Sequence, residues 1–153
     1  MINWINYKYG TNLTEEDLSE IRNFTLLWNI FDNTIFKNSF SIERLEQTII
    51  NRNLQLAPFQ DVLVYFKDRY VIDGATNDRF DHLNFRRSDR EDLVRNVLTG
   101  VNNVDHEKIL ALGIIVYRFR NNLFHGNKNF MEIEQQTDNF RNANMFIRMF
   151  LDD

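Results

Sequence analysis

Apolar residues recur every three or four positions along most of the chain, which is the spacing of one face of an α-helix. The first series starts at Leu18 and continues to Ile35, after a good N-cap at Thr14 and three acidic residues that favour a helix start. It predicts a helix that ends near Lys37. Residues 1–12 show no clear period, and we expect them to form an N-terminal arm that packs on the body.

Two more helices are expected in the next third of the chain. One begins at Ser39 or Ser41 and ends before Pro58, and that proline suits the first turn of the helix that follows. The third helix carries its apolar face as far as Tyr70. Residues 71–72 are also compatible with a strand, but no alternating pattern surrounds them, so helix is the better interpretation.

The helical period disappears in residues 73–87, which we interpret as an irregular loop rich in turn formers. Residues 88–91 read as a capping box that opens a short helix, and Gly100 is expected to stop it in a left-handed conformation. Asp105 then caps a longer helix that Gly126 closes.

A last helix is expected to open at residues 129–132, which resemble another capping box. Its inward positions are Ile133, Phe140, Ala143, Ile147 and Phe150. No repeat or linker divides the chain, so residues 1–153 are predicted to form one all-α domain, a bundle of five or six helices.

Composition narrows the class of protein further. A hydrophobic fraction of 43% with a single proline indicates a folded helical protein, and the absence of cysteine excludes disulfides and thiolate metal sites. The N-terminus does not read as a signal peptide, and no apolar run approaches the roughly 18 residues of a membrane span. We therefore expect a cytoplasmic protein with no membrane contact. Its net charge of −4 means that any RNA contact must use a local basic patch.

The helix expected after Asp105 ends in the sequence IIVYRFRNNLFHG, in which Arg120 and Asn121 precede His125 and Gly126. This arrangement resembles the motif of the HEPN superfamily, in which an arginine, often followed by asparagine or aspartate, lies four to six residues before a histidine. HEPN domains are small and helical, and many are metal-independent ribonucleases of bacterial toxin–antitoxin and anti-phage systems. The resemblance implies a HEPN-like bundle.

The resemblance also implies a mechanism and partners. Arg120 would stabilise the charge on the phosphate, His125 would act as general acid or base, and Asn121 would orient the histidine. The 2′-hydroxyl of RNA is the nucleophile, so no metal or other cofactor is needed. Each chain supplies one such pair, and the family forms its composite site in a homodimer. A cognate antitoxin or a defence partner protein is a further expected partner.

Helix geometry supplies a competing interpretation. At about 100° per residue, with Arg118 at zero, Asn122 falls near 40°, His125 near 340° and Asn121 near 300°, so these four form one polar stripe. Arg120 falls near 200°, among apolar neighbours. It could therefore extend to an acidic residue on another helix, with His125 as an ordinary helix-end residue.

Four residues are candidates for RNA binding: Arg118, Asn122, Arg86 and Arg87. The last two belong to an arginine- and aromatic-rich segment, residues 79–90, that suits single-stranded RNA but equally suits a loop with salt bridges to its own aspartates. The remaining histidines are interpreted as surface residues. A catalytically silent HEPN-like module that binds a partner protein, nucleotide or RNA is the alternative function, and a phage- or plasmid-encoded regulator is a third.

Overall fold

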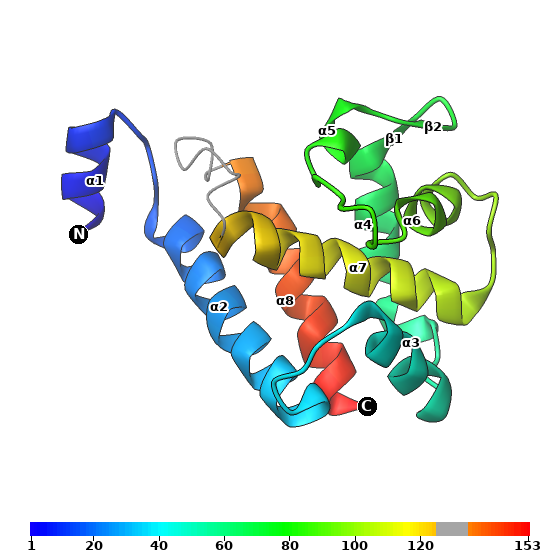
Figure 1. Ribbon diagram of the computed structural model, residues 1–153. Coiled ribbons are helices and arrows are strands. Elements are labelled where there is room, and N and C mark those ends of the chain that lie inside the picture. The colour runs from blue at the N-terminus through cyan, green and yellow to red at the C-terminus, as the bar shows by residue number, and fades with distance from the viewer. Residues whose placement is uncertain (125–134) are drawn as a thin grey trace.

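The computed structural model describes residues 1–124 and 135–153, and within these ranges the predicted all-α class is confirmed (Figure 1). In chain order the elements are α1 (Ile2–Tyr9), α2 (Glu15–Phe36), α3 (Ile42–Asn51), the 3-10 helix η1 (Ala57–Phe59), α4 (Gln60–Tyr70), β1 (Val71–Ile72), β2 (Ala75–Thr76), α5 (Asp78–Asp81), α6 (Glu91–Leu98), α7 (Asp105–Phe124) and α8 (Thr137–Asp152). The helices expected from the apolar spacing correspond to α2, α3, α4, α6, α7 and α8, while α1 and α5 are additional.

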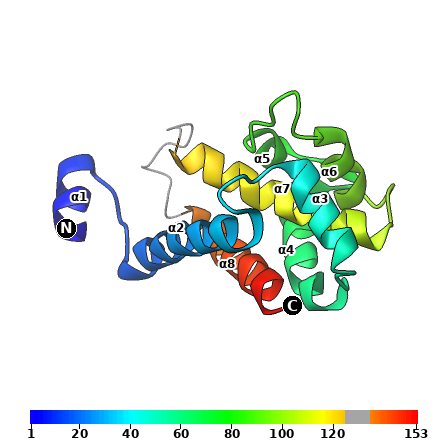
Figure 2. The ribbon, with the colours of Figure 1, turned by 60° about the horizontal axis from the view of Figure 1, so that its bottom comes forward.

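The N-terminal arm is itself a helix, α1, and it stands apart from the body in both ribbon views (Figures 1 and 2). No α1 residue is buried, contrary to the expected packing of this segment on the body. The side chain of Asn6 both donates to the backbone carbonyl of Leu13 and accepts from its N–H, each at 2.9 Å. Polar contacts to the residues before α2 therefore hold α1, rather than burial of its own apolar side chains.

The start of α2 follows the predicted capping chemistry. The Thr14 hydroxyl accepts from the backbone N–H of Asp17 at 3.2 Å, and the Asp17 carboxylate accepts from the backbone N–H of Thr14 at 2.7 Å. This reciprocal pair satisfies two amides that the first turn would otherwise leave without partners. Downstream, Phe24, Trp28 and Phe31 bury one face of the helix, as their spacing predicts.

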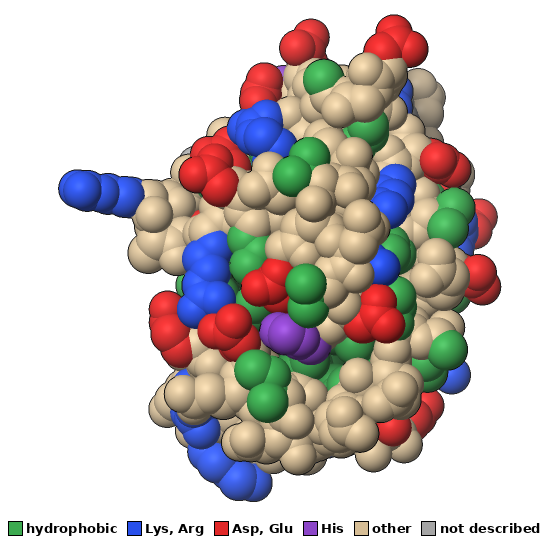
Figure 3. All heavy atoms as spheres, turned by 90° about the vertical axis from the view of Figure 1, so that its right-hand side faces the viewer, with side chains coloured by type: hydrophobic (Ala, Val, Ile, Leu, Met, Phe, Trp, Pro, Cys, Tyr) green, Lys and Arg blue, Asp and Glu red, His purple; other side chains and the backbone are tan. Residues whose placement is uncertain are grey.

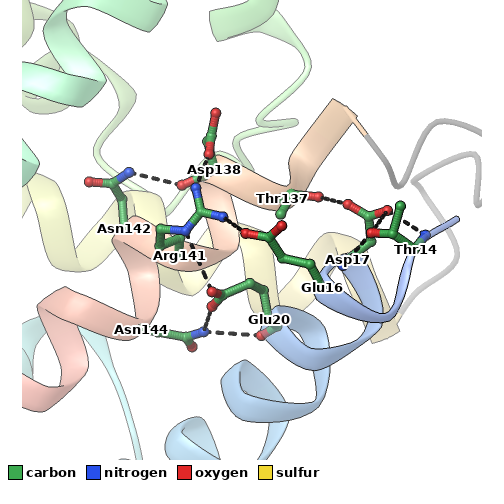
Figure 4. A network of polar contacts seen from close by, with 9 residues as sticks. All are labelled: Thr14, Glu16, Asp17, Glu20, Thr137, Asp138, Arg141, Asn142 and Asn144. Carbon is green, nitrogen blue, oxygen red and sulfur yellow. Dashed lines mark hydrogen bonds and ion pairs between the residues drawn. The ribbon is translucent and has the colours of Figure 1, made fainter.

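A polar network joins the first half of α2 to α8 (Figure 4). The Thr137 hydroxyl at the start of α8 donates to the Asp17 carboxylate. Arg141, one turn later, pairs with Glu16 at 2.5 Å and lies 3.5 Å from Glu20. The apolar face of α8 is buried at the predicted positions Phe140, Ala143, Ile147 and Phe150. The expected helix start at residues 129–132, and Ile133, lie outside the described residues.

The hairpin after α4 corrects the helix interpretation of residues 71–72. Val71–Ile72 pair with Ala75–Thr76 in antiparallel register. The two residues between them, Asp73 and Gly74, have φ angles of 51° and 78°. Positive φ at both central residues is what a tight type I′ hairpin turn requires, and Asp-Gly favours it. The expected loop 73–87 therefore contains β2 and the short helix α5.

The capping box expected at residues 88–91 does not form. Helix α6 begins at Glu91, and the residue before it, Arg90, has φ of 55° and makes no side-chain cap. Asp89 instead turns inward, where its carboxylate accepts from the backbone N–H of Arg86 at 2.7 Å. The predicted left-handed conformation of Gly100 after α6 is confirmed by its φ of 81°.

Helix α7 crosses the middle of the molecule, and α3, α4, α6 and α8 pack around it (Figure 1). All residues from Ile109 to Val116 are buried. Gly113 allows the close approach of α3, because a Cβ atom there would lie 2.5 Å from Cδ2 of Leu45. These apolar side chains of α7 are therefore buried within one chain, and their number alone is no argument for a dimer.

Candidate active site

The last turns of α7 carry four polar residues on an otherwise apolar helix: Arg118, Arg120, Asn121 and Asn122. The apolar core holds this end of the helix in place, because Phe119 packs against the rings of Phe66 and Phe140. The two arginines, two residues apart, have different surroundings.

Arg118 is 1% exposed and bonded on several sides. Its Nη1 donates to Asp89 Oδ2 at 2.8 Å, and its Nε donates to the carbonyl of Leu83 at 3.1 Å. Burial lowers the pKa of its guanidinium, and the negative charge of Asp89 raises it in part. A charge buried this deeply is retained because its partner is close and its donors are satisfied.

Asn122 completes the same structural cluster. Its side-chain amide donates to the carbonyls of Leu83 at 3.0 Å and His82 at 3.4 Å, and its oxygen accepts from Arg118 at 3.3 Å. These bonds hold residues 82–83 against the last turns of α7, which we call the motif helix. The RNA-binding role suggested for Arg118 and Asn122 does not fit their burial, because neither side chain offers surface to a ligand.

Arg120 points elsewhere and is only partly buried. Its Nη1 donates to Oδ1 of Asn121 at 3.0 Å, and its guanidinium carbon lies 5.4 Å from the ring centroid of Phe124. No ion pair among the described residues includes Arg120. The alternative in which Arg120 serves an acidic residue on another helix is therefore not seen in the described part of the chain.

Two polar atoms of this pair lack a hydrogen-bond partner within the described ranges: Nε of Arg120 and Nδ2 of Asn121. Buried donors are rarely left unpaired, because each costs about 1–3 kcal/mol of desolvation free energy. Donors of this kind, beside an arginine that has no carboxylate partner among the described residues, are groups that suit an oxyanion. Arg120 and Asn121 contact each other directly, and the predicted role of Asn121 in orienting His125 stays a prediction. His125 and Gly126 lie in residues 125–134, outside the described residues.

The residues of the arginine- and aromatic-rich segment 79–90 have different surroundings. Arg86 and Arg87 are exposed beside a surface hollow of about 280 Å³. Arg90 pairs with Glu46 of α3 at 2.9 Å rather than with an aspartate of its own loop, and Phe80 is fully buried under Arg95. Arg86 and Arg87 stay predicted RNA contacts, since both side chains are exposed.

Sequence reasoning missed that a second group of basic side chains shares one pocket. Arg69, Arg79 and His82 line one pocket of about 210 Å³ with Gln136. No local sequence pattern joins these residues, because they come from different elements. Arg69 lies in α4, Arg79 in α5, His82 just after α5, and Gln136 just before α8. By contrast, the face over the start of α7 mixes acidic, basic and apolar side chains without a continuous basic surface (Figure 3).

Comparison of the chain with protein-family models, with curated proteins and with solved structures found no match. Within the described ranges, no group of three or more His, Asp or Glu residues is arranged to hold a metal ion. None of the described helices has the length and apolar content needed to cross a membrane.

Proposed function

We propose that this protein is a metal-independent endoribonuclease whose site consists of Arg120, Asn121 and His125, as the resemblance to the HEPN superfamily implies. The observation that supports this most is the state of Arg120. Two residues earlier, Arg118 has a buried carboxylate partner, whereas Arg120 has none among the described residues. A permanent positive charge at the end of a buried helix, with no carboxylate partner among the described residues, suits a phosphate.

The chemistry uses the nucleophile that RNA itself carries. His125 accepts the proton of the 2′-hydroxyl as that oxygen attacks the phosphorus, and Arg120 stabilises the negative charge of the phosphorane. The bond from phosphorus to the 5′-oxygen breaks, and the leaving oxygen takes a proton from a second acid. The products are a 2′,3′-cyclic phosphate and a 5′-hydroxyl. Asn121 orients the side chain of His125.

The second acid is the reason to propose a dimer. One chain carries one Arg120–His125 pair, so a second protomer would supply the other histidine. Phe124, the last described residue of α7, is 54% exposed and offers apolar surface at the helix end. Sedimentation at micromolar concentration should show a dimer, and Phe124→Asp should shift it toward monomer and lower the cleavage rate. A protein that sediments only as a monomer and still cleaves RNA would exclude the composite site.

The test of function is cleavage of single-stranded RNA in excess EDTA. Wild-type protein should cut RNA, leave 2′-O-methyl RNA and DNA intact, and give 2′,3′-cyclic phosphate ends. Arg120→Ala and His125→Ala should each reduce the rate at least 100-fold, since each removes a group that acts in the transition state. The matched control is Arg22→Ala, an arginine with a 69% exposed side chain on α2. Cleavage that EDTA abolishes, or that both variants retain, would reject the proposal.

The biological setting is proposed at the level of class: a cytoplasmic toxin or anti-phage effector, with a cognate antitoxin or defence partner. Induced expression should arrest growth of a bacterial host, and His125→Ala should relieve the arrest. The alternative is the catalytically silent module that binds a partner protein, nucleotide or RNA. It predicts no cleavage of any RNA, and growth effects that persist in His125→Ala.

A further inference from the structure

A pocket of about 210 Å³ opens between the end of α4, α5 and the residue before α8. Its lining includes the side chains of Arg69, Arg79 and His82, together with Tyr70 and Gln136. At roughly 30 Å³ per water, the volume accommodates about seven waters. That is enough for a tetrahedral phosphate and the first atoms of its ester group, and too little for an enclosed dinucleotide.

Among the described residues, the two arginines of this pocket have no acidic partner. Other arginines of the protein have carboxylates within ion-pair distance, such as Arg90 with Glu46 and Arg118 with Asp89. No ion pair among the described residues includes Arg69 or Arg79. Two cations that line one pocket, with no described carboxylate to compensate them, raise the local positive potential and favour an anion.

One donor in the pocket is already buried without a partner. Nε of Arg69 has no hydrogen bond within the described part of the chain. The guanidinium lies 5.9 Å from the ring centroid of Tyr70, so packing restricts its orientation. Burial raises the pKa of the Tyr70 hydroxyl, and the neighbouring Arg69 guanidinium lowers it in part. A planar arginine fork held in one orientation is suited to bidentate contact with phosphate oxygens.

The pocket is attached to the motif end of α7. Asn122, one residue after Asn121, donates to the carbonyls of His82 and Leu83, and both of those residues line the pocket. Arg118 donates to the same Leu83 carbonyl. These buried bonds link the position of the pocket to that of the helix that carries Arg120.

We propose that this pocket binds a phosphate group, with Arg69 and Arg79 as the principal ligands and His82 and Gln136 as further polar contacts. That the phosphate belongs to the RNA backbone, next to the one that is cleaved, rests on the proposed function. Inorganic phosphate carries the same chemistry, and the experiment separates these two sources.

The first probe is a fluorescent 2′-O-methyl RNA hexanucleotide, which cannot be cleaved. Arg79→Gln should lower its affinity about tenfold, as expected for loss of a charged hydrogen bond. It should also reduce the slope of log affinity against log salt by about 0.7, the value for one phosphate contact on a single strand. Arg79 is exposed and outside any described ion pair, so this variant should fold normally. The matched control is Arg22→Gln, with the same charge change on α2.

The second probe is inorganic phosphate, which is titrated into wild-type protein and into the Arg79→Gln and Arg69→Lys variants. Its binding is measured by NMR from the shifts of the arginine Nε–Hε signals. Phosphate should shift the Arg69 signal in wild type and much less in Arg79→Gln. If Arg79→Gln matches Arg22→Gln with both probes, the phosphate site is overturned. If it weakens inorganic phosphate alone, the site stands and the RNA source is overturned. If wild type cleaves no RNA but both probes depend on Arg79, the nuclease proposal fails while the phosphate site stands.

Discussion

Arg118 on the motif helix and Asp89 before α6 form an ion pair of 2.8 Å with side chains that are only 1% and 5% exposed. The same Asp89 oxygen accepts the backbone N–H of Arg86 at 2.7 Å. The pair therefore fixes the loop before α6 against α7. It also explains why the capping box failed to form, since Asp89 faces the core instead of solvent.

Removing one member of this pair should strongly destabilise the protein. Asp89→Ala leaves the Arg118 charge buried and is expected to lower the free energy of unfolding by about 3–5 kcal/mol. Urea denaturation of wild type and variant measures the difference. The control is Asp92→Ala, an exposed aspartate on α6, which should cost at most about 1 kcal/mol. Equal effects of the two substitutions would mean that the buried pair does not stabilise the fold.

Arg120→Ala should behave in the opposite way from Arg118→Ala. Arg120 has no described carboxylate partner, so its removal leaves no buried charge uncompensated. We expect a change in unfolding free energy of about 1 kcal/mol or less, the net value of one hydrogen bond. Arg118→Ala should cost at least 3 kcal/mol, since it leaves Asp89 unpaired. Thermal denaturation of the two variants side by side gives the comparison. A loss for Arg120→Ala as large as for Arg118→Ala would assign Arg120 to the fold.

The Asp17 carboxylate should make stability depend on acid. Burial raises the pKa of Asp17, but hydrogen bonds from Thr137 and from the backbone and hydroxyl of Thr14 outweigh it, so the folded-state pKa lies below its usual 3.8. A lowered folded-state pKa stabilises the protein above the unfolded value, and this contribution disappears as the pH falls through the folded pKa.

Asp17→Asn removes this titration. The difference in urea midpoint between wild type and Asp17→Asn should be largest near pH 7 and shrink below pH of about 3.8. Exposed Glu15→Gln in the same turn is the control and should show a smaller difference. A gap between wild type and Asp17→Asn that is constant from pH 7 to pH 2 would contradict the stabilising role of the charged carboxylate.

Gly113→Ala should destabilise the crossing of α3 and α7, because the added Cβ would lie 2.5 Å from Leu45 and 3.3 Å from Phe146. Overpacking of this kind costs about 1–3 kcal/mol, against a gain of about 1 kcal/mol in helix propensity. Leu45→Ala makes room, so the double variant should be more stable than the sum of the single effects predicts. Gly100→Ala, which meets nothing within 4 Å, should be additive with Leu45→Ala.

Local chemistry explains which parts of the fold the sequence could predict. Thr14 and Ser41 cap α2 and α3 as expected, because a cap depends on residues three positions apart. The hairpin has a local sequence signal, since Asp73-Gly74 lies between two residue pairs that are compatible with β-strands. Alternation of apolar and polar residues over a longer run does not detect strands of two residues. The inward turn of Asp89 had no local signal, because Arg118 lies 29 residues away.

The candidate site divides in the same way. Arg120 and Asn121 could be named from the sequence because the motif is contiguous, and their role as a site stays a prediction. The burial of Arg118 and Asn122 could not be foreseen, because a helical wheel gives a direction but not what covers that face. Arg69 and Arg79 converge only through the packing of α4 and α5, so spacing along the chain could not join them.

The two tryptophans give the molecule separate optical reporters. Trp28 is 5% exposed and lies 5.0 Å from the Phe40 ring and 6.0 Å from Tyr117 of α7, whereas Trp4 on α1 is 59% exposed. Emission from Trp28 should be blue-shifted and resistant to acrylamide, and emission from Trp4 red-shifted and readily quenched. With Trp4→Phe, the remaining fluorescence reports on the contact of α2 with the motif helix. With Trp28→Phe, it reports on α1 alone, and so on any partner that comes to cover that helix.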